Sequence, residues 1–243
     1  YPAADVAAHL VGMTDVDDRG QEGMELAYDA WLTGENGAKE VVKDLRGRTV
    51  KELRLVKAAR PGQNLTLSID LRLQYLAHRE LKKAVEDAGA VAGSIVILDV
   101  LTGEVLAMSN LPTYNPNDRS RARGAGLRNR AITDLYDPGS AVKPWVILAA
   151  LESGKFKPED VIDTNPGYFM VGSKPIKDHR NYGAMDLAMA IAKSSNIAMT
   201  KITFALDTNT VRDMYARLGV GQPIGTGFPG ESAGRLPVLK PAQ

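Results

Sequence analysis

The 243-residue sequence has no cysteine, only three histidines and few aromatic side chains, with two Trp, eight Tyr and four Phe. Without thiols it contains no disulfide, no thiolate nucleophile and no cysteine-based zinc or iron-sulfur site. The histidines His9, His78 and His179 lack the four-residue spacing and the intervening glutamate of a zinc hydrolase. We expect His78 to lie on the surface of a helix. The sequence therefore predicts no metal centre.

An excess of charge of one sign is also lacking, because 30 basic residues face 29 acidic ones and the formal net charge is +1. Such a chain has no electrostatic attraction for nucleic acid or for an anionic membrane surface. The longest uncharged stretches, residues 105–117 and 218–230, contain proline and are shorter than the roughly 20 residues of a membrane-spanning helix. One basic cluster lacks interleaved aromatic residues, so we expect a solvated loop and no nucleic-acid partner. Its members are Arg119, Arg121, Arg123, Arg128 and Arg130.

What the sequence does contain is 44% hydrophobic residues, which is enough for a real core. Residues 1–60 are rich in charge and glycine, and one stretch with helical spacing of apolar residues covers residues 23–32. The segment Arg60-Pro-Gly-Gln63 is the first clear break in composition and predicts a linker. We therefore predict one region over residues 1–60 and a second over residues 61–243.

The second region mixes strands and helices without a regular strand-helix-strand alternation. Apolar alternation predicts a strand over residues 65–69, and Asp70 is expected to cap a helix that ends at Gly89. Residues 93–98 and 104–108 predict the two antiparallel strands of a hairpin. The expected fold class is α+β, with a mixed or antiparallel sheet and helices packed on it, rather than a doubly wound parallel sheet.

Three further helices are expected towards the C-terminal end. Residues 142–151 are apolar on every side, which is typical of a helix buried in the core. Apolar helices are also expected over residues 187–193 and 197–204. Residues 219–243 are rich in glycine and proline, so we expect a loop there.

Two motifs in that loop match known sites without their structural context. Residues 230–234 match G-x-S-x-G, but the strand, the helix and the downstream histidine of a hydrolase nucleophile elbow are missing from the sequence. Residues 225–230 spell G-x-G-x-x-G, yet neither a strand before them nor a helix after them is predicted. We interpret both motifs as turns.

The segment Ser140-Ala-Val-Lys143 has the composition of a nucleophile and its base. Residues three apart on a helix share a face, so the Lys143 amine is able to reach the Ser140 hydroxyl. A serine hydroxyl becomes a good nucleophile when a neighbouring base takes its proton, and lysine accepts a proton only when neutral. Burial and positive potential must then lower the lysine pKa from about 10.4 to about 7 or 8. The Pro138-Gly139 turn and the apolar helix supply such a setting.

A second pair, Ser194 and Asn196, follows an apolar helix some fifty residues later in the chain. In this context Ser194 is able to pass a proton between Lys143 and a leaving group, while the Asn196 amide holds a substrate carbonyl. The alternative is that Ser140, Ser194 and Asn196 are helix caps without a catalytic role.

Longer stretches around these residues resemble the class B penicillin-binding proteins, most closely their division-specific type, penicillin-binding protein 3. The resemblance is carried by residues 128–144 (RNRAITDLYDPGSAVKP) and 193–196 (KSSN), and it extends over essentially the whole chain. Residues 15–25 resemble the non-catalytic pedestal of that family. Further matching stretches are Ser68–Gln74, Thr102–Met108 and Tyr114–Asn117.

The resemblance implies the penicillin-binding transpeptidase fold in truncated form. Part of the pedestal would occupy residues 1–60, and the N-terminal part of the transpeptidase domain would occupy residues 61–243. The expected location is the bacterial inner membrane, with the catalytic domain in the periplasm and the N-terminal anchor missing. Expected partners are a septal glycan polymerase and other division proteins.

The resemblance also implies a D,D-transpeptidase that cross-links peptidoglycan stem peptides at the division septum, without a metal or an organic cofactor. Ser140 would be the acylated nucleophile and the target of β-lactams. Lys143 would be the base, and Ser194 and Asn196 would form the second motif of the site.

The sequence departs from the family pattern in two ways. Asp137 and Ala141 stand where the family usually has Glu and Thr, and we expect Ala141 to alter the hydration of the pocket or its lactam preference. The third family motif is missing, because no lysine is followed by Thr-Gly or Ser-Gly. Since the chain also begins at Tyr1 and has no membrane segment, we expect the first part of a longer transpeptidase that lacks its anchor.

Three other functions remain open on these residues: a serine β-lactamase, a lactam sensor and a catalytically silent division scaffold. A lactamase shares Ser140, Lys143 and the Ser-x-Asn motif, but it needs a deacylating base. Neither the Glu-x-x-Leu-Asn nor the Tyr-Gly-Asn pattern that supplies such a context occurs in the sequence.

Overall fold

The structure is a computed structural model that describes residues 1–118, 120, 122 and 124–237. In this part of the chain no helix is long and apolar enough to cross a membrane.

Contacts between residues divide the chain into two compact units. The first combines residues 1–134 with residues 225–232, and the second combines residues 135–224 with residues 233–243. Each unit is described by itself. The boundary predicted between residues 60 and 61 is a different division of the chain, and it stays a prediction.

The α+β class expected from the sequence is confirmed. The described residues form five two-stranded sheets, and the two strands of each sheet run antiparallel. Four of the pairs are hairpins of consecutive strands, whereas β8 and β9 lie between β7 and β10 in the sequence. The pairs are β1 (Met13–Thr14) with β2 (Gly20–Glu22), β3 (Ala38–Lys43) with β4 (Thr49–Lys57), β5 (Gly93–Leu98) with β6 (Val105–Leu111), β7 (Ile162–Asp163) with β10 (Ala184–Met185), and β8 (Tyr168–Val171) with β9 (Lys174–Lys177).

Short helices form the N-terminal part of the first unit. A 3-10 turn and α1 precede β1 and β2, and α2 and α3 follow them. The helix predicted over residues 23–32 is therefore present in two pieces, because the backbone of Tyr28 leaves helical geometry with a φ of −117°. These elements are the 3-10 turn Ala4–Val6, α1 (Ala8–Val11), α2 (Gly23–Ala27) and α3 (Asp29–Leu32).

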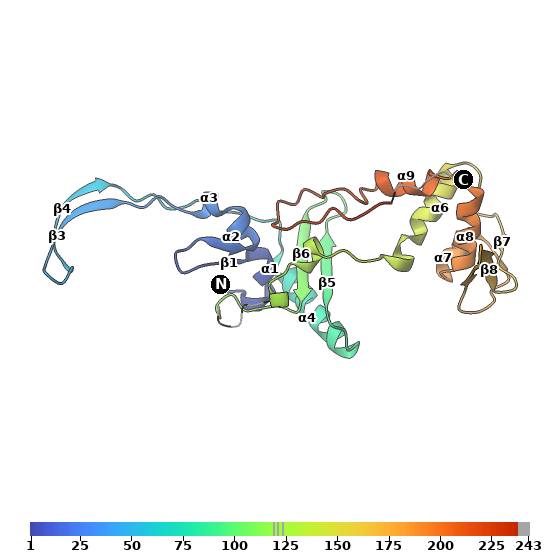
Figure 1. Cartoon of the computed structure of the whole chain (residues 1–243), viewed down its shortest axis with the longest axis horizontal. Coiled ribbons are helices and arrows are strands. Elements are labelled where there is room, and N and C mark those ends of the chain that lie inside the picture. Colours follow the sequence, from blue (N-terminus) through green and yellow to red (C-terminus); the bar gives the residue numbers. More distant parts are fainter. Residues whose placement is uncertain (119, 121, 123, 238–243) are drawn as a thin grey trace. The chain divides into compact units, whose positions relative to one another are not determined.

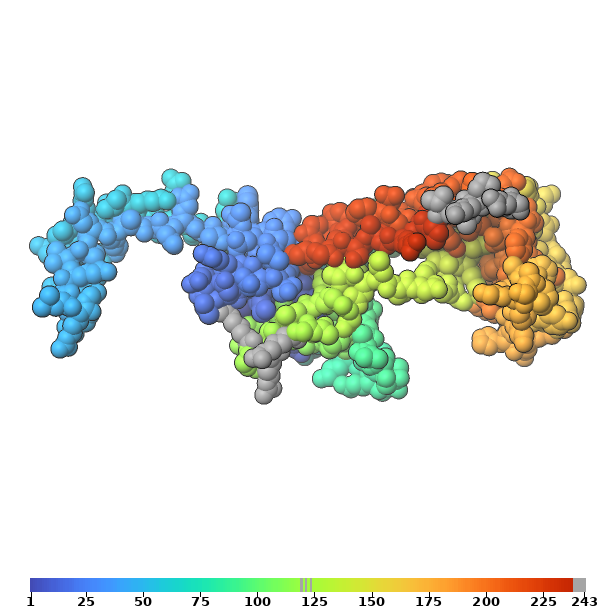
Figure 2. Space-filling model, in the orientation of Figure 1, coloured from blue at the N-terminus to red at the C-terminus, as the bar shows by residue number. Residues whose placement is uncertain are grey.

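Strands β3 and β4 form a two-stranded ribbon that is mostly exposed. Figure 1 shows the two strands paired along their length, and Figure 2 shows the ribbon as a thin layer of atoms. Cross-strand ion pairs join Lys39 to Glu52 and Arg54 to Glu40. Exposed ion pairs of this kind contribute at most about 1 kcal/mol each. The backbone ladder therefore provides most of the order in the ribbon.

Helix α4 (Leu71–Asp87) packs against the hairpin of β5 and β6. Its start follows the prediction, because Asp70 accepts a hydrogen bond from the Arg72 N–H at 2.8 Å. The fully buried Gln74 ties the helix to β6: Nε2 donates to the Met108 carbonyl oxygen at 2.9 Å, and Oε1 accepts from the Met108 N–H at 2.8 Å. A buried amide paired at both ends fixes the register of the helix on the strand.

The expectation that His78 is exposed is wrong. This side chain is only 8% exposed, with Nδ1 3.2 Å from Ser109 Oγ and Nε2 3.6 Å from Asp5 Oδ2. Polar partners on two other segments replace the water that the buried ring loses. The helical spacing around His78 does not reveal these partners.

The strand expected over residues 65–69 does not form. One backbone hydrogen bond, from the Asp70 N–H to the Leu106 carbonyl oxygen at 2.9 Å, joins the end of this segment to β6. Ile69 packs against the small core of Leu10 and Met108. The apolar alternation therefore reflects an extended chain lying on a core rather than a strand in a ladder.

The arginine-rich loop is only partly described. Arg128 and Arg130 both pair with Asp134, at 2.9 Å and 2.8 Å, around the short helix α5 (Arg130–Thr133). These two side chains are thus engaged within the first unit. The other members of the cluster, Arg119, Arg121 and Arg123, lie outside the described residues.

Residues 219–237 form neither helix nor strand, in agreement with the predicted loop. The G-x-S-x-G serine, Ser232, donates its hydroxyl proton to the Thr133 carbonyl oxygen at 2.8 Å. That bond makes Ser232 part of the attachment of the loop to the first unit, and the strand-turn-helix of a hydrolase elbow is not formed.

The described part of the second unit contains four helices, and three of them match the predicted ones. Buried residues from three of the helices form its core, including Ile147, Ala150, Leu187 and Ile202. The first helix is buried on one face only, because Leu148 is 41% exposed, so the expectation of a helix buried on every side is wrong. The helices are α6 (Lys143–Glu152), α7 (Leu187–Ala192), α8 (Asn196–Ala205) and α9 (Thr210–Arg217).

Candidate active site

Ser140 lies in a 3-10 turn, Gly139–Val142, directly before α6. Gly139 has a φ of 58°, which glycine adopts without strain, and its N–H donates to Asp137 Oδ1 at 3.2 Å. The Ser140 side chain is exposed, and its hydroxyl makes no hydrogen bond within the part of the chain that the structure describes. The turn therefore presents an unengaged hydroxyl at the start of a helix.

Lys143 begins α6, and three oxygen atoms hold its amine. Nζ donates to the Ser194 carbonyl oxygen at 2.6 Å, to Ser194 Oγ at 3.0 Å and to Asn196 Oδ1 at 2.7 Å. Three of the four predicted site residues thus come together across more than fifty positions of sequence. The predicted contact with Ser140 is not formed: among the described residues no hydrogen bond joins Nζ to Ser140 Oγ. The three acceptors already satisfy all three donors of the ammonium group.

Ser194 adopts a left-handed conformation, with a φ of 52°, immediately after α7. Its N–H donates to the Ile191 carbonyl oxygen at 2.8 Å, and the Ser195 N–H donates to the Ala190 carbonyl oxygen at 3.0 Å. This pair of bonds is a Schellman motif, in which glycine usually takes the left-handed position. A side chain there costs roughly 1–2 kcal/mol. Serine bears that strain and places its hydroxyl next to the Lys143 amine.

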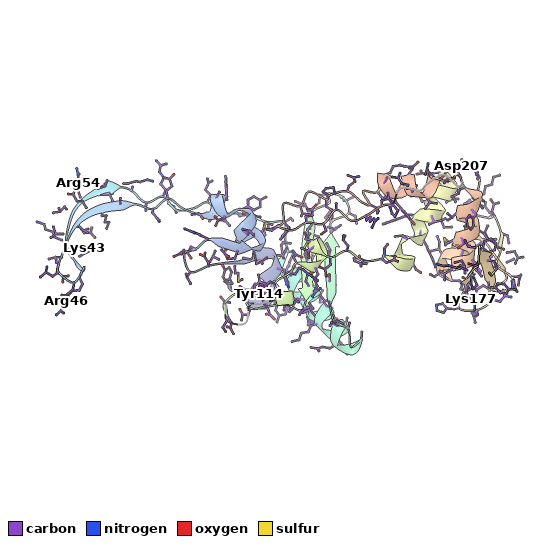
Figure 3. The ribbon with its side chains drawn as sticks, in the orientation of Figure 1. Lys43, Arg46, Arg54, Tyr114, Lys177 and Asp207 are labelled. Carbon is purple, nitrogen blue, oxygen red and sulfur yellow. The ribbon has the colours of Figure 1, made fainter. Side chains whose placement is uncertain are left out.

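Asn196 begins α8 and uses both ends of its amide. Oδ1 accepts from Lys143, and Nδ2 donates to the carbonyl oxygen of Lys177 at 2.9 Å. Lys177, which is labelled in Figure 3, is the last residue of β9. The second N–H of Nδ2 remains for the substrate carbonyl that we expect Asn196 to hold.

The helix-cap alternative does not fit these bonds. The N-terminus of α6 has no side-chain cap, and the cap of α8 is the buried Ser195, whose hydroxyl accepts from the Ala198 N–H at 3.0 Å. Ser140, Ser194 and Asn196 cap neither helix.

Asp178 completes the arrangement, and the sequence analysis missed it. Its Oδ1 accepts from the Asn196 N–H at 2.6 Å and from the Ile197 N–H at 3.1 Å, while Oδ2 accepts from the Ser195 hydroxyl at 2.6 Å. The residue follows β9, seventeen positions before Ser195 in the sequence. No local pattern links an aspartate after a strand to a helix that begins so far along the chain.

Two opposing effects set the protonation of Lys143. Burial lowers the pKa of its amine, and the negative charge of Asp178 raises it. The lowering moves the amine towards the neutral form that a base requires. The three acceptor oxygens around Nζ favour the protonated form.

An apolar hollow of about 620 Å³ borders the turn that carries Ser140. Ala141 and Val142 line it together with the aromatic side chains of Tyr136, Trp145 and Tyr215. Ala141 therefore lines a hollow beside the turn, and Ser140 is not one of the lining residues. The expected effect of Ala141 on hydration or lactam preference stays a prediction. Elsewhere in residues 1–118, 120, 122 and 124–237, no three His, Asp or Glu side chains gather closely enough to share a metal ion.

Comparison with known proteins gives the family. Residues 93–240 match the penicillin binding protein transpeptidase domain, and residues 1–67 match the penicillin-binding protein dimerisation domain. The chain belongs to the penicillin-binding protein transpeptidase family. The resemblance to class B penicillin-binding proteins of the penicillin-binding protein 3 type is thereby confirmed.

Two curated members of the family are similar over almost the whole chain. The chain is 39% identical over 237 residues to the probable peptidoglycan D,D-transpeptidase PbpC of Pseudomonas aeruginosa, covering 98% of this chain and 42% of that protein. It is 42% identical over 237 residues to the peptidoglycan D,D-transpeptidase FtsI of Escherichia coli, covering 98% of this chain and 40% of that protein. The chain thus spans about two fifths of these relatives.

A solved structure supports the same fold. Penicillin binding protein 3 from Mycobacterium tuberculosis aligns with a TM-score of 0.82 at 32% identity, covering 98% of this chain and 50% of that chain. The same Mycobacterium protein has been solved in complex with aztreonam and with ampicillin.

Proposed function

We propose that the protein is a serine-type peptidoglycan D,D-transpeptidase in which Ser140 is the nucleophile. The observation that carries the proposal is the Lys143 amine, which Ser194 and Asn196 hold within the same compact unit as Ser140. The names of the relatives, which are peptidoglycan D,D-transpeptidases, support the same reaction.

In the proposed reaction Ser140 Oγ attacks the carbonyl carbon between the two terminal D-alanines of a donor stem peptide. The hydroxyl proton passes to Lys143, and a proton reaches the departing amine through the Ser194 hydroxyl. Terminal D-alanine leaves, and an ester to Ser140 remains. An amine of a neighbouring stem peptide then attacks that ester, which forms the cross-link and returns the proton to Ser140.

β-Lactams would acylate the same hydroxyl, since their strained amide carbonyl takes the place of the peptide carbonyl. The crystal structures of the Mycobacterium relative with aztreonam and ampicillin support this part of the proposal by similarity. Opening of the lactam ring leaves the amine tethered, so the acyl-enzyme persists where a base for hydrolysis is missing.

The cellular setting is proposed from the relatives as well. Similarity to FtsI supports a role in cross-linking at the division septum, with a septal glycan polymerase and other division proteins as partners. The corresponding location is the bacterial inner membrane, with the catalytic domain in the periplasm.

The test is covalent labelling of the protein at its natural length with a fluorescent penicillin. We expect stable labelling of the wild type, loss of labelling in Ser140→Ala and full labelling in Ser232→Ala, which changes the other serine that lies in a nucleophile-like motif. Transfer of a stem peptide to an amine acceptor then separates a transpeptidase from a lactam sensor. Rapid release of the label would instead identify a β-lactamase, and absence of labelling would identify a scaffold.

A further inference from the structure

The turn that holds Lys143 is anchored by residues outside the predicted motif. Residues 194–196 contribute all three oxygens around Nζ, and residues 177 and 178 bind this turn from the side of β9. The Lys177 carbonyl oxygen accepts from the Asn196 side chain, and the Asp178 carboxylate accepts from the Asn196 backbone. Asn196 is thus held at two points by neighbouring residues of one strand end.

The Asp178 carboxylate serves three donors at once, from Ser195, Asn196 and Ile197. Two of them are backbone N–H groups in the first turn of α8, which have no partner within the helix. The third is the Ser195 hydroxyl, which itself caps the helix. A carboxylate at a helix N-terminus is also favoured by the helix dipole. Asp178 therefore joins the strand end, the cap and the helix in a single contact.

The hydrogen bonds of Asp178 also constrain Ser194, which directly precedes Ser195 in the sequence. Ser194 sits in the left-handed region, where a non-glycine residue persists only if its surroundings hold it. The Schellman bonds hold it from the side of α7, and the Asp178 bonds to the next three residues hold it from the side of α8. Without the Asp178 hydrogen bonds, rotation of the turn is able to relieve the backbone strain at Ser194. The oxygens around Lys143 Nζ then move with the turn.

We propose that Asp178 is a positioning residue of the active site, which fixes the turn 194–196 so that Ser194 Oγ and Asn196 Oδ1 meet the Lys143 amine. The proposal rests on the transpeptidase function proposed above. Asp178 acts through the turn and touches none of the reacting atoms.

The chain offers a matched control in Asp186. Its side chain also caps a helix of the second unit, accepting from the Met189 N–H at 2.7 Å at the start of α7. No hydrogen bond or ion pair of the described residues joins Asp186 to Lys143, Ser194 or Asn196. Replacing it removes a helix cap of the same chemical kind without touching the turn.

The experiment compares wild type, Asp178→Ala, Asp178→Asn and Asp186→Ala at natural length. The acylation rate constant by fluorescent penicillin is measured at saturating probe, and thermal unfolding is followed in parallel. We expect a rate constant about 100-fold lower in Asp178→Ala, the loss typical of a misplacement near 1 Å in an active site. Asp178→Asn keeps an acceptor oxygen for the backbone donors, so we expect partial rescue, to about tenfold below wild type. Asp186→Ala should acylate at the wild-type rate.

The inference is overturned if Asp178→Ala acylates at the wild-type rate, if Asp186→Ala slows to the same extent, or if only the half-saturating probe concentration changes. If Asp178→Ala does not fold, the test uses Asp178→Asn. A wild-type acylation rate constant in Asp178→Asn then overturns the inference. A wild type that does not label at all refutes the proposed function first. Wild-type labelling with unaffected variants refutes the positioning role alone.

Discussion

Ser194 allows a test that separates stability from reactivity. The residue occupies the left-handed position of a Schellman motif with a φ of 52°, and its hydroxyl lies 3.0 Å from Lys143 Nζ. Ser194→Ala removes the hydroxyl and keeps the backbone strain. Ser194→Gly removes the hydroxyl and the strain together.

The expected difference in stability follows from the backbone conformation. The left-handed region costs a residue with a side chain roughly 1–2 kcal/mol more than glycine. Glycine has a more flexible unfolded state, which offsets about 0.4–1 kcal/mol of that advantage. We therefore expect the free energy of unfolding of Ser194→Gly to exceed that of Ser194→Ala by about 1 kcal/mol. Both variants lose the hydrogen bond between the Ser194 hydroxyl and Lys143 Nζ and keep the one to the carbonyl oxygen, so these contributions cancel in the comparison.

Reactivity should not follow stability. Both variants lose the hydroxyl proposed to pass a proton between Lys143 and the leaving group, and such groups contribute about 10²- to 10⁴-fold to rate. We expect both to acylate with fluorescent penicillin at least about 100-fold more slowly than wild type. The more stable variant, Ser194→Gly, should be as slow as the alanine variant.

The assay combines urea unfolding by circular dichroism with the acylation time course. Gly172→Ala calibrates the strain, because Gly172 has a φ of 58° in the turn between β8 and β9 and no atom lies within 4 Å of an added Cβ. It should lower stability by about 1 kcal/mol and leave acylation unchanged. Equal free energies of unfolding for the two Ser194 variants would refute the backbone strain at this position. Acylation at the wild-type rate in either variant would refute the proposed proton transfer through the Ser194 hydroxyl.

Three further outcomes are expected. Lys143→Arg keeps a positive charge but cannot lose its proton, so acylation should fall by at least about 100-fold, and an unchanged rate would exclude Lys143 as the base. Ile202→Ala empties a fully buried core position and should lower the free energy of unfolding by about 2–5 kcal/mol, whereas Leu148→Ala at a 41% exposed position should lower it much less. Burial lowers the pKa of His9 below its ordinary 6.5, so the unfolded chain takes up the proton more readily than the folded one. The free energy of unfolding should therefore decrease as the pH falls below 6.5. Urea titrations across that range check the sign, and His9→Gln is the control that should lack this dependence on pH.

Local patterns in the sequence determined much of the fold. The hairpin of β5 and β6, the Asp70 cap of α4 and the apolar helices α6, α7 and α8 follow from spacing and cap chemistry within a few residues. Such signals are local, because helix and strand periods and cap bonds involve near neighbours in the chain. The same local view misplaced His78, whose burial depends on Ser109 and Asp5.

The sequence by itself also predicted the candidate catalytic side chains: a serine after a Pro-Gly turn, a lysine three positions later and a Ser-x-Asn pair. Only the tertiary structure decided which of them meet. Lys143 Nζ binds Ser194, 51 positions away, in place of the nearby Ser140, and Asp178 anchors that turn from a strand end 17 positions before Ser195. The physical reason is that these contacts depend on how closely α6, α8 and β9 pack against one another. Local sequence patterns do not determine the distance between elements that are far apart in the chain.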